Sequence, residues 1–204
     1  MFRNRKDAGK KLARALEKYR DEKALVLAIP RGGVEVGFEV AEYLKADFSM
    51  LISRKLPYPN DPEAGFGAVA EDGSIFVFSD NLYGLSGETI NQILCEQKNE
   101  IIRRINVLRG GKPLPDIKDR IIILVDDGIA GGSTMRASIM LCRNRKAKKI
   151  VVASPVSSRE VAEELKELSD DVVILEKPPF FRAVAQVYEN WYDVSDEEVK
   201  RFVK

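Results

Sequence analysis

Residues 122–134 read IILVDDGIAGGST, and this stretch decides the fold expected for the rest of the chain. Four apolar residues lead into two adjacent carboxylates, Asp126 and Asp127, then a glycine-rich turn and the helix-like segment Met135–Arg143. This order predicts a buried strand, a loop and a helix, whose first N–H groups and positive dipole end bind anions. Open parallel sheets bind ligands beyond the carboxyl ends of their strands, so both aspartates are predicted to meet a polar ligand.

The loop differs from the two best-known phosphate motifs. It lacks the Gly-Lys-Ser/Thr ending of a Walker motif, and the dinucleotide fingerprint has its acidic residue only about 20 residues after its glycines. It resembles instead the phosphoribosyl-pyrophosphate (PRPP) motif of the type I phosphoribosyltransferases. The resemblance implies that Asp126 and Asp127 bond the ribose hydroxyls. The residues that it assigns to the 5′-phosphate are Ile129, Ala130, Gly131, Gly132, Ser133 and Thr134.

One residue departs from that motif. Where the family usually has Thr-Gly, this chain has Gly131-Gly132, so one hydroxyl that would reach the 5′-phosphate is missing. The alternative interpretation of the stretch is a buried strand followed by a solvated Asp-Asp-Gly turn that binds nothing.

Composition narrows the function classes. The 33 Lys and Arg against 32 Asp and Glu give a formal charge of +1, which offers no global field to attract nucleic acid or a membrane. No apolar run of about 18 residues and no export signal is visible, so we expect a cytoplasmic protein. Histidine is absent, so a general base would have to be Asp, Glu or Lys. Cys95 and Cys142 fall in helical patterns and are predicted to be buried free thiols.

A second anion-binding loop is predicted nearer the start of the chain. An apolar strand, Ala24–Ile29, is broken by Pro30-Arg31-Gly32-Gly33, and a helical pattern resumes at Val34. Paired glycines expose N–H groups at a helix start, and arginine adds a forked cation. The loop resembles the family's pyrophosphate loop, which assigns Arg31, Gly32 and Gly33 to pyrophosphate.

A lid and a hairpin are together predicted over about residues 54–78. Asp47–Ser53 reads as a strand that delivers Arg54 and Lys55 at its end, and the resemblance assigns both to pyrophosphate. Three prolines and two glycines are taken to exclude regular structure from Pro57–Gly67, a loop of the length typical of active-site lids. The alternative is a surface loop with two solvated cations. A hairpin is expected to follow, with strands at Gly67–Ala70 and Ser74–Phe78.

The remaining pattern alternates helices with strands. Helices are expected at 7–19, 86–108 and 158–168, and strands at 148–153 and 171–175. This alternation predicts an α/β fold with a doubly wound, mostly parallel sheet of about five strands. We expect one domain over 1–204, with its core at about 24–175 and a C-terminal hood at 176–204. In the hood, Phe180 and Phe181 are assigned to the base, although simple terminal packing would also explain them. A short capped helix is expected from Asp196.

The whole chain also resembles a stand-alone branch of the family with no assigned base. The resemblance implies Mg²⁺-dependent transfer of the 5-phosphoribosyl group from PRPP to a nitrogen nucleophile, expected to be a nucleobase, with release of pyrophosphate. Mg²⁺ would be carried by PRPP without a direct protein ligand, and a homo-oligomer, expected to be a dimer, is implied. The residues implied to be catalytic are Asp126, Asp127, Arg31 and Lys55.

The acceptor and the occurrence of turnover stay open. Ala130 stands where the 6-oxopurine enzymes have an acidic residue, so hypoxanthine and guanine are disfavoured, while adenine-like, pyrimidine and non-nucleobase acceptors remain. Two other functions are also compatible with the sequence. One is a PRPP- or nucleotide-binding regulator of the same fold, and the other is an unrelated nucleotide-binding α/β protein.

Overall fold

A five-stranded parallel sheet forms the main layer of the molecule. The computed structural model describes residues 1–79, 82 and 84–202. The strands run in the order β2-β1-β6-β7-β8, and every neighbouring pair is parallel. The doubly wound sheet of about five strands is therefore confirmed. Its strands are β1 (Leu25–Ala28), β2 (Asp47–Met50), β6 (Ile121–Val125), β7 (Lys149–Val156) and β8 (Asp171–Glu176).

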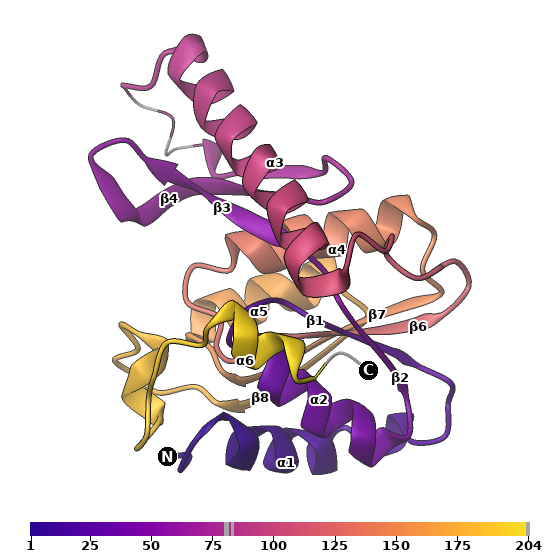
Figure 1. Ribbon diagram of the computed structural model, residues 1–204. Coiled ribbons are helices and arrows are strands. Elements are labelled where there is room, and N and C mark those ends of the chain that lie inside the picture. Colours follow the sequence, from indigo (N-terminus) through magenta and orange to yellow (C-terminus); the bar gives the residue numbers. More distant parts are fainter. Residues whose placement is uncertain (80–81, 83, 203–204) are drawn as a thin grey trace.

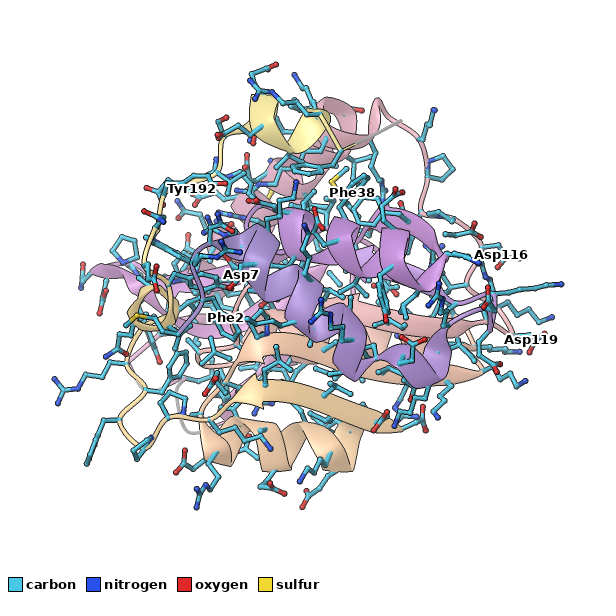
Figure 2. The ribbon with its side chains drawn as sticks, turned by 90° about the horizontal axis from the view of Figure 1, so that it is seen from below. Phe2, Asp7, Phe38, Asp116, Asp119 and Tyr192 are labelled. Carbon is cyan, nitrogen blue, oxygen red and sulfur yellow. The ribbon has the colours of Figure 1, made fainter. Side chains whose placement is uncertain are left out.

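Helices cover both faces of this sheet (Figure 1). One face carries α1 (Arg5–Ala15) and α2 (Gly33–Leu44), which lie side by side across the strands (Figure 2), and the other carries α4 (Ser133–Asn144) and α5 (Arg159–Leu168). Along β6 the side chains alternate between two apolar clusters. Ile122 and Leu124 pack with residues of α4 and α5, while Ile123 and Val125 pack with those of α1 and α2. Burial on both faces explains why this strand is continuously apolar.

The chain leaves β1 and β6 in opposite directions. From β1 it passes through α2 to β2 on one side, and from β6 through α4 to β7 on the other. Neighbouring strands that diverge in this way form a topological switch point, where open α/β sheets bind their ligands. The two predicted anion loops follow these two strands, so the fold brings both to one place.

A second, antiparallel sheet projects from the main body together with helix α3 (Gly87–Arg109) (Figure 1). Its strands, in the order β3-β4-β5, are β3 (Ser53–Tyr58), β4 (Asp61–Ala70) and β5 (Ile75–Val77). The expected hairpin around Glu71-Asp72-Gly73 is confirmed as the β4–β5 connection.

The prediction that Pro57–Gly67 lacks regular structure is wrong, because most of this segment belongs to the long β3–β4 hairpin. Pro57 lies on an edge strand, between two register shifts, where the missing N–H of proline is tolerated. The expected strand Asp47–Ser53 is present as β2, but its predicted end is wrong, because β2 ends at Met50. Arg54 and Lys55 consequently lie inside β3 and belong to the antiparallel sheet.

A buried ion pair joins the two sheets. Arg109, the last residue of α3, donates to the carbonyl oxygen of Met50 at 2.9 Å and pairs with Glu71, each side chain being 5% exposed. Glu71 in turn accepts the N–H of Ile52 at 2.9 Å. Removal of one partner from a buried pair costs roughly 3–5 kcal/mol, so these contacts hold the base of the hairpin firmly against the main sheet.

Helix α3 shows why one cysteine was misjudged. Cys142 is buried in α4, as predicted, whereas Cys95 on α3 is exposed, so the prediction of two buried thiols is wrong for Cys95. The buried residues of α3 lie along the side that packs against the antiparallel sheet, and much of the remaining surface of this projecting helix meets solvent.

The C-terminal segment returns to the N-terminus. A 3₁₀ helix, η3 (Val184–Val187), precedes Tyr188, which forms a parallel bridge with Phe2. Helix α6 (Asp196–Lys200) begins with a capping box, as predicted, while Val203 and Lys204 lie outside the described residues. Within the described part of the chain, no helix is both long and apolar enough to cross a membrane.

Candidate functional site

The loop after β6 forms one wall of a cavity of about 350 Å³. Asp126 lines this wall with all six residues predicted for the 5′-phosphate, Ile129 to Thr134. The opposite wall comes from the antiparallel sheet, through Lys55 on β3 and Ala64 and Gly65 near the hairpin tip, together with Phe78. Two sheets therefore bring residues far apart in the sequence around one small space.

The start of α4 gives this cavity an anion-binding character. The helix begins at Ser133 after Gly132, whose φ of 73° lies in the left-handed region that favours glycine. Its first turn reads Ser-Thr-Met-Arg and contains no acidic residue, so main-chain N–H groups and two hydroxyls meet the cavity at this end.

Arg136 holds the main chain of the loop after β6 in place. Its side chain is 4% exposed, and it donates to the carbonyl oxygen of Gly131 at 2.7 Å while pairing with Glu164 on α5. Its guanidinium also lies 5.4 Å from the ring of Phe78, which lines the cavity. These contacts orient the carbonyl oxygen of Gly131 toward the guanidinium of Arg136.

Asp126 is the carboxylate in the cavity wall. Its Oδ1 accepts the N–H of Asp127 at 2.9 Å. Burial raises the pKa of Asp126 well above the usual value, and the charge of Asp127 raises it further. A ligand that donates hydrogen bonds to this carboxylate would offset part of the cost of its burial.

Asp127 faces elsewhere. Of the two aspartates, only Asp126 is among the described residues that line the cavity. The Oδ2 of Asp127 accepts from the Nε of Arg5 at 2.7 Å, and its carbonyl oxygen accepts from the Tyr188 hydroxyl at 2.7 Å. A Cβ added to Gly32 would lie only 1.8 Å from Oδ2, so the carboxylate rests against the Arg-Gly-Gly loop.

Two of the predicted pyrophosphate residues, Arg31 and Arg54, belong to a group of four arginines. Arg31 is 40% exposed, with its guanidinium 3.7 Å from Asp196, and Arg54 donates to Gln97 at 3.1 Å. Burial lowers the pKa of Arg54, and the charges of Arg104, Arg31 and Arg103 lower it further. We call Arg31, Arg54, Arg103 and Arg104 the arginine cluster.

Sequence reasoning missed the two α3 members of the arginine cluster. Arg103 and Arg104 both pair with Glu100 at helical spacing, which is also the pattern of an ordinary solvated helix face. Only the fold, by packing α3 on β3, places them near Arg54, so no local signal could have identified them.

The predicted base-binding rings lie away from the cavity. Phe180 is 83% exposed, and Phe181 packs with the buried cluster that includes Phe2 and Tyr188. Both line a separate hollow with residues of α5. The hood approaches the motif loop through Val184 instead, whose Cγ1 would lie 2.3 Å from a Cβ on Gly128.

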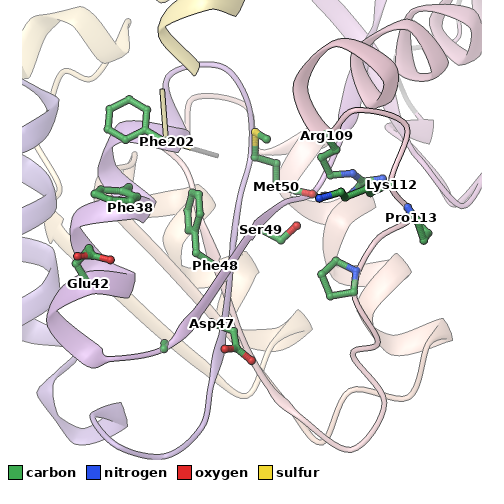
Figure 3. Close-up of a pocket in the computed structure, with 12 residues that line it drawn as sticks. Phe38, Glu42, Asp47, Phe48, Ser49, Met50, Arg109, Lys112, Pro113 and Phe202 are labelled. Atoms are coloured by element: carbon green, nitrogen blue, oxygen red, sulfur yellow. Dashed lines mark hydrogen bonds between the residues drawn. The ribbon is translucent and has the colours of Figure 1, made fainter. Parts of the chain in front are cut away.

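A second cavity, of about 390 Å³, lies along the edge strand β2 (Figure 3). The rings of Phe38, Phe48 and Phe202 stand on one side, and Arg109 and Lys112 on the other. Its lining comes from outside both anion loops, although it is slightly larger than the first cavity. Volume alone would therefore not have selected the cavity beside the motif loop.

Comparison with known proteins decides the family. A family model described as the phosphoribosyl transferase domain matches residues 3–190, most of the chain. The chain belongs to the phosphoribosyl transferase family. This confirms the resemblance drawn from residues 122–134.

The similar proteins are consistent with a phosphoribosyl transferase. Two Mycobacterium tuberculosis proteins, provisionally named phosphoribosyl transferases MT0597 and Rv0571c, are 38% identical over 205 residues. The match covers 100% of this chain and 46% of each relative, so the chain spans about half the length of the curated relatives it matches. The crystal structure of TT1426 from Thermus thermophilus is 34% identical, with a TM-score of 0.83 over 100% of this chain and 97% of that one.

Proposed function

We propose that this phosphoribosyl transferase moves the 5-phosphoribosyl group from PRPP to a nitrogen nucleophile and releases pyrophosphate. One observation carries the proposal: the cavity joins the motif loop, with Asp126 at its start, to Lys55, and these come from two distant parts of the chain. A helix N-terminus on one wall and a lysine on the other suit a ligand that bears a phosphate.

Each wall would hold a different part of PRPP. The main chain of residues 131–134 and the hydroxyls of Ser133 and Thr134 would bind the 5′-phosphate, and Asp126 would accept hydrogen bonds from the ribose. Departure of pyrophosphate leaves positive charge on the sugar, so the leaving anion must be held and water excluded. Arg31 and the N–H groups of Gly32 and Gly33 would hold pyrophosphate, supported by Arg54 and Lys55, while the hairpin tip covers the cavity.

Magnesium would enter with the substrate. Mg²⁺ binds phosphate oxygens, keeps several water ligands and needs no cage made only of protein groups. The described residues contain no group of three or more His, Cys, Asp or Glu able to hold a metal ion. On the basis of this coordination chemistry we assign Mg²⁺ to the oxygens of PRPP, where it would neutralise charge on the leaving pyrophosphate.

The acceptor is proposed only by class. Ala130 in the cavity wall leaves no acid to assist a 6-oxopurine, so an adenine-like, pyrimidine or other nitrogen nucleophile is preferred. Phe180 and Phe181 would reach a base only after movement of the hood, whereas Phe78 already lines the cavity. A homodimer in the cytoplasm stays a prediction.

A PRPP-binding regulator without turnover is the second candidate. Two features favour it: Gly131 lacks the usual hydroxyl, and Asp127 is held by Arg5 away from the cavity. Both features would weaken binding of the ribose 5-phosphate group, and catalysis requires this group to be held in a fixed position.

A measurement of pyrophosphate release distinguishes the transferase from the regulator. The protein is incubated with PRPP, Mg²⁺ and a panel of bases, with an Asp126→Asn variant as the control. Release that depends on a base and on Asp126 supports the transferase, and PRPP binding without release supports the regulator. If PRPP does not bind but adenine nucleotides raise the melting temperature, both candidates fail and an unrelated nucleotide-binding function is indicated.

A further inference from the structure

The acidic pair of the motif is divided between two environments. Asp126 lines the cavity, whereas the carboxylate of Asp127 is paired with the buried Arg5, whose side chain is 3% exposed. Successive side chains of an extended strand point to opposite sides, and although β6 ends at Val125, the contacts of Asp126 and Asp127 diverge in the same way. The Oδ1 of Asp126 would lie 3.1 Å from a Cβ on Gly33, but only Asp127 is paired with Arg5.

Arg5 is held by the hood as well as by Asp127. Its NH1 donates to the carbonyl oxygen of Tyr192 at 2.8 Å, and its guanidinium lies 4.0 Å from the ring of Trp191. Tyr188 donates to the main chain of Asp127 from the same segment. Arg5 thus joins α1, the motif loop and the hood at one point, and planar stacking with two donated hydrogen bonds suits arginine but not lysine.

The carboxylate of Asp127 reaches the pyrophosphate loop. Its Oδ2 would lie 1.8 Å from a Cβ on Gly32, immediately before α2. A negative charge at this position would repel a bound pyrophosphate unless a nearby cation compensated it. Arg5, at 2.7 Å, is that cation.

We propose that Asp127 is a positioning residue for the Arg-Gly-Gly loop and that Arg5 neutralises it so that pyrophosphate can bind there. Asp126 is then the carboxylate of the pair that binds the ribose. The N-terminal helix and the hood become part of the pyrophosphate site through Arg5. This inference rests on the proposed PRPP function.

The test compares two ligands, ribose 5-phosphate and Mg²⁺-pyrophosphate, by isothermal titration calorimetry. A hydrogen bond to a charged group corresponds to roughly tenfold or more in affinity, so Asp126→Asn should weaken ribose 5-phosphate binding about tenfold. Asp127→Asn should weaken it less than about threefold, a change below that of a lost charged hydrogen bond. Asp126→Asn is the matched control, because it removes the same charge one residue away.

The pair also predicts a rescue. Arg5→Met leaves the charge of Asp127 uncompensated beside Gly32, so pyrophosphate affinity should fall about tenfold or more, with a smaller change for ribose 5-phosphate. Adding Asp127→Asn to Arg5→Met removes that charge and should restore pyrophosphate affinity to within about threefold of the wild type. A purely structural pair would not distinguish the two ligands in this way.

Each outcome has a defined meaning. The positioning role is refuted if Asp127→Asn weakens ribose 5-phosphate binding as much as Asp126→Asn does. It is also refuted if the double variant does not regain pyrophosphate affinity. If the wild type binds neither ligand, the proposed function fails first. Circular dichroism verifies folding. Should Arg5→Met not fold, Arg5→Gln replaces it, and the expected result is the same loss of pyrophosphate affinity, because the positive charge is removed.

Discussion

Replacing Gly131 with threonine tests the phosphate loop at the residue where the chain departs from the motif. Gly131 lies outside the left-handed region, and no described atom would lie within 4 Å of a Cβ placed on it. A threonine should therefore fit without strain. Its hydroxyl would restore the missing donor to the 5′-phosphate.

The expected gain follows from the energy of one hydrogen bond. A bond to a charged phosphate is worth roughly 1.5–3 kcal/mol, and ordering the side chain takes back about 0.5–1 kcal/mol. The remainder corresponds to an affinity increase of about tenfold for ribose 5-phosphate. Calorimetric titration of both forms measures this change directly.

The neighbouring glycine provides the matched control. Gly132 has a φ of 73°, and a Cβ there would lie 2.7 Å from the NH1 of Arg136. A β-branched residue in this conformation is strained by roughly 1–3 kcal/mol, so Gly132→Thr should lower both stability and affinity. Weaker binding by Gly131→Thr, or equal effects of the two substitutions, would show that the loop does not hold the phosphate as proposed.

Three further predictions concern PRPP, Arg31 and Asp126. PRPP with Mg²⁺ at 100 times its Kd adds about 2.7 kcal/mol, so differential scanning fluorimetry should show a rise of roughly 5–10 °C; no shift at millimolar PRPP would contradict the site. Arg31→Ala, at a residue only loosely paired with Asp196, should weaken pyrophosphate binding more than ribose 5-phosphate binding in calorimetry, and equal losses would show that its assignment is wrong. Because the pKa of Asp126 is raised in the folded state, the stability from this group is present below its unfolded pKa of about 3.9 and lost as pH rises through the folded value. Asp126→Asn should accordingly be more stable than the wild type to urea at pH 7, with little difference near pH 4, and a variant less stable at pH 7 would contradict this.

Local patterns predicted the parallel sheet and the main cavity wall. The apolar run of residues 122–125, the two acids and the glycines carry their information within thirteen residues. The helix caps that the structure shows at Ser86, Ser158 and Ser195 are equally local, because each serine accepts from an N–H three residues on. The boundaries of α3, α5 and β8 followed closely because each depends on neighbours in the sequence, whereas those of β2 and α1 did not.

The predictions that failed concern features set by contacts between residues distant in sequence. A strand at Pro57 was excluded on the assumption that this position must donate a backbone N–H, which proline lacks. At the edge of a sheet no such donor is needed. The separation of Asp126 from Asp127 agrees with simple alternation, but the partner of Asp127 is 122 residues away. Exposure of Cys95 likewise depended on α3 projecting from the body, which no helical pattern shows.

The register shifts around Pro57 divide the long hairpin into a fixed base and a distal arm. Buried Leu56 and Phe66, together with the Arg109–Glu71 pair, fix the base, while the arm carries Ala64 and Gly65 to the cavity. Ladder bonds are weakest at the shifts, so bending is concentrated there. An arm that bends at these shifts moves Ala64 and Gly65, and with them one wall of the cavity, while Leu56 and Phe66 stay packed. The shape of the cavity is thereby separated mechanically from the core that keeps the protein folded.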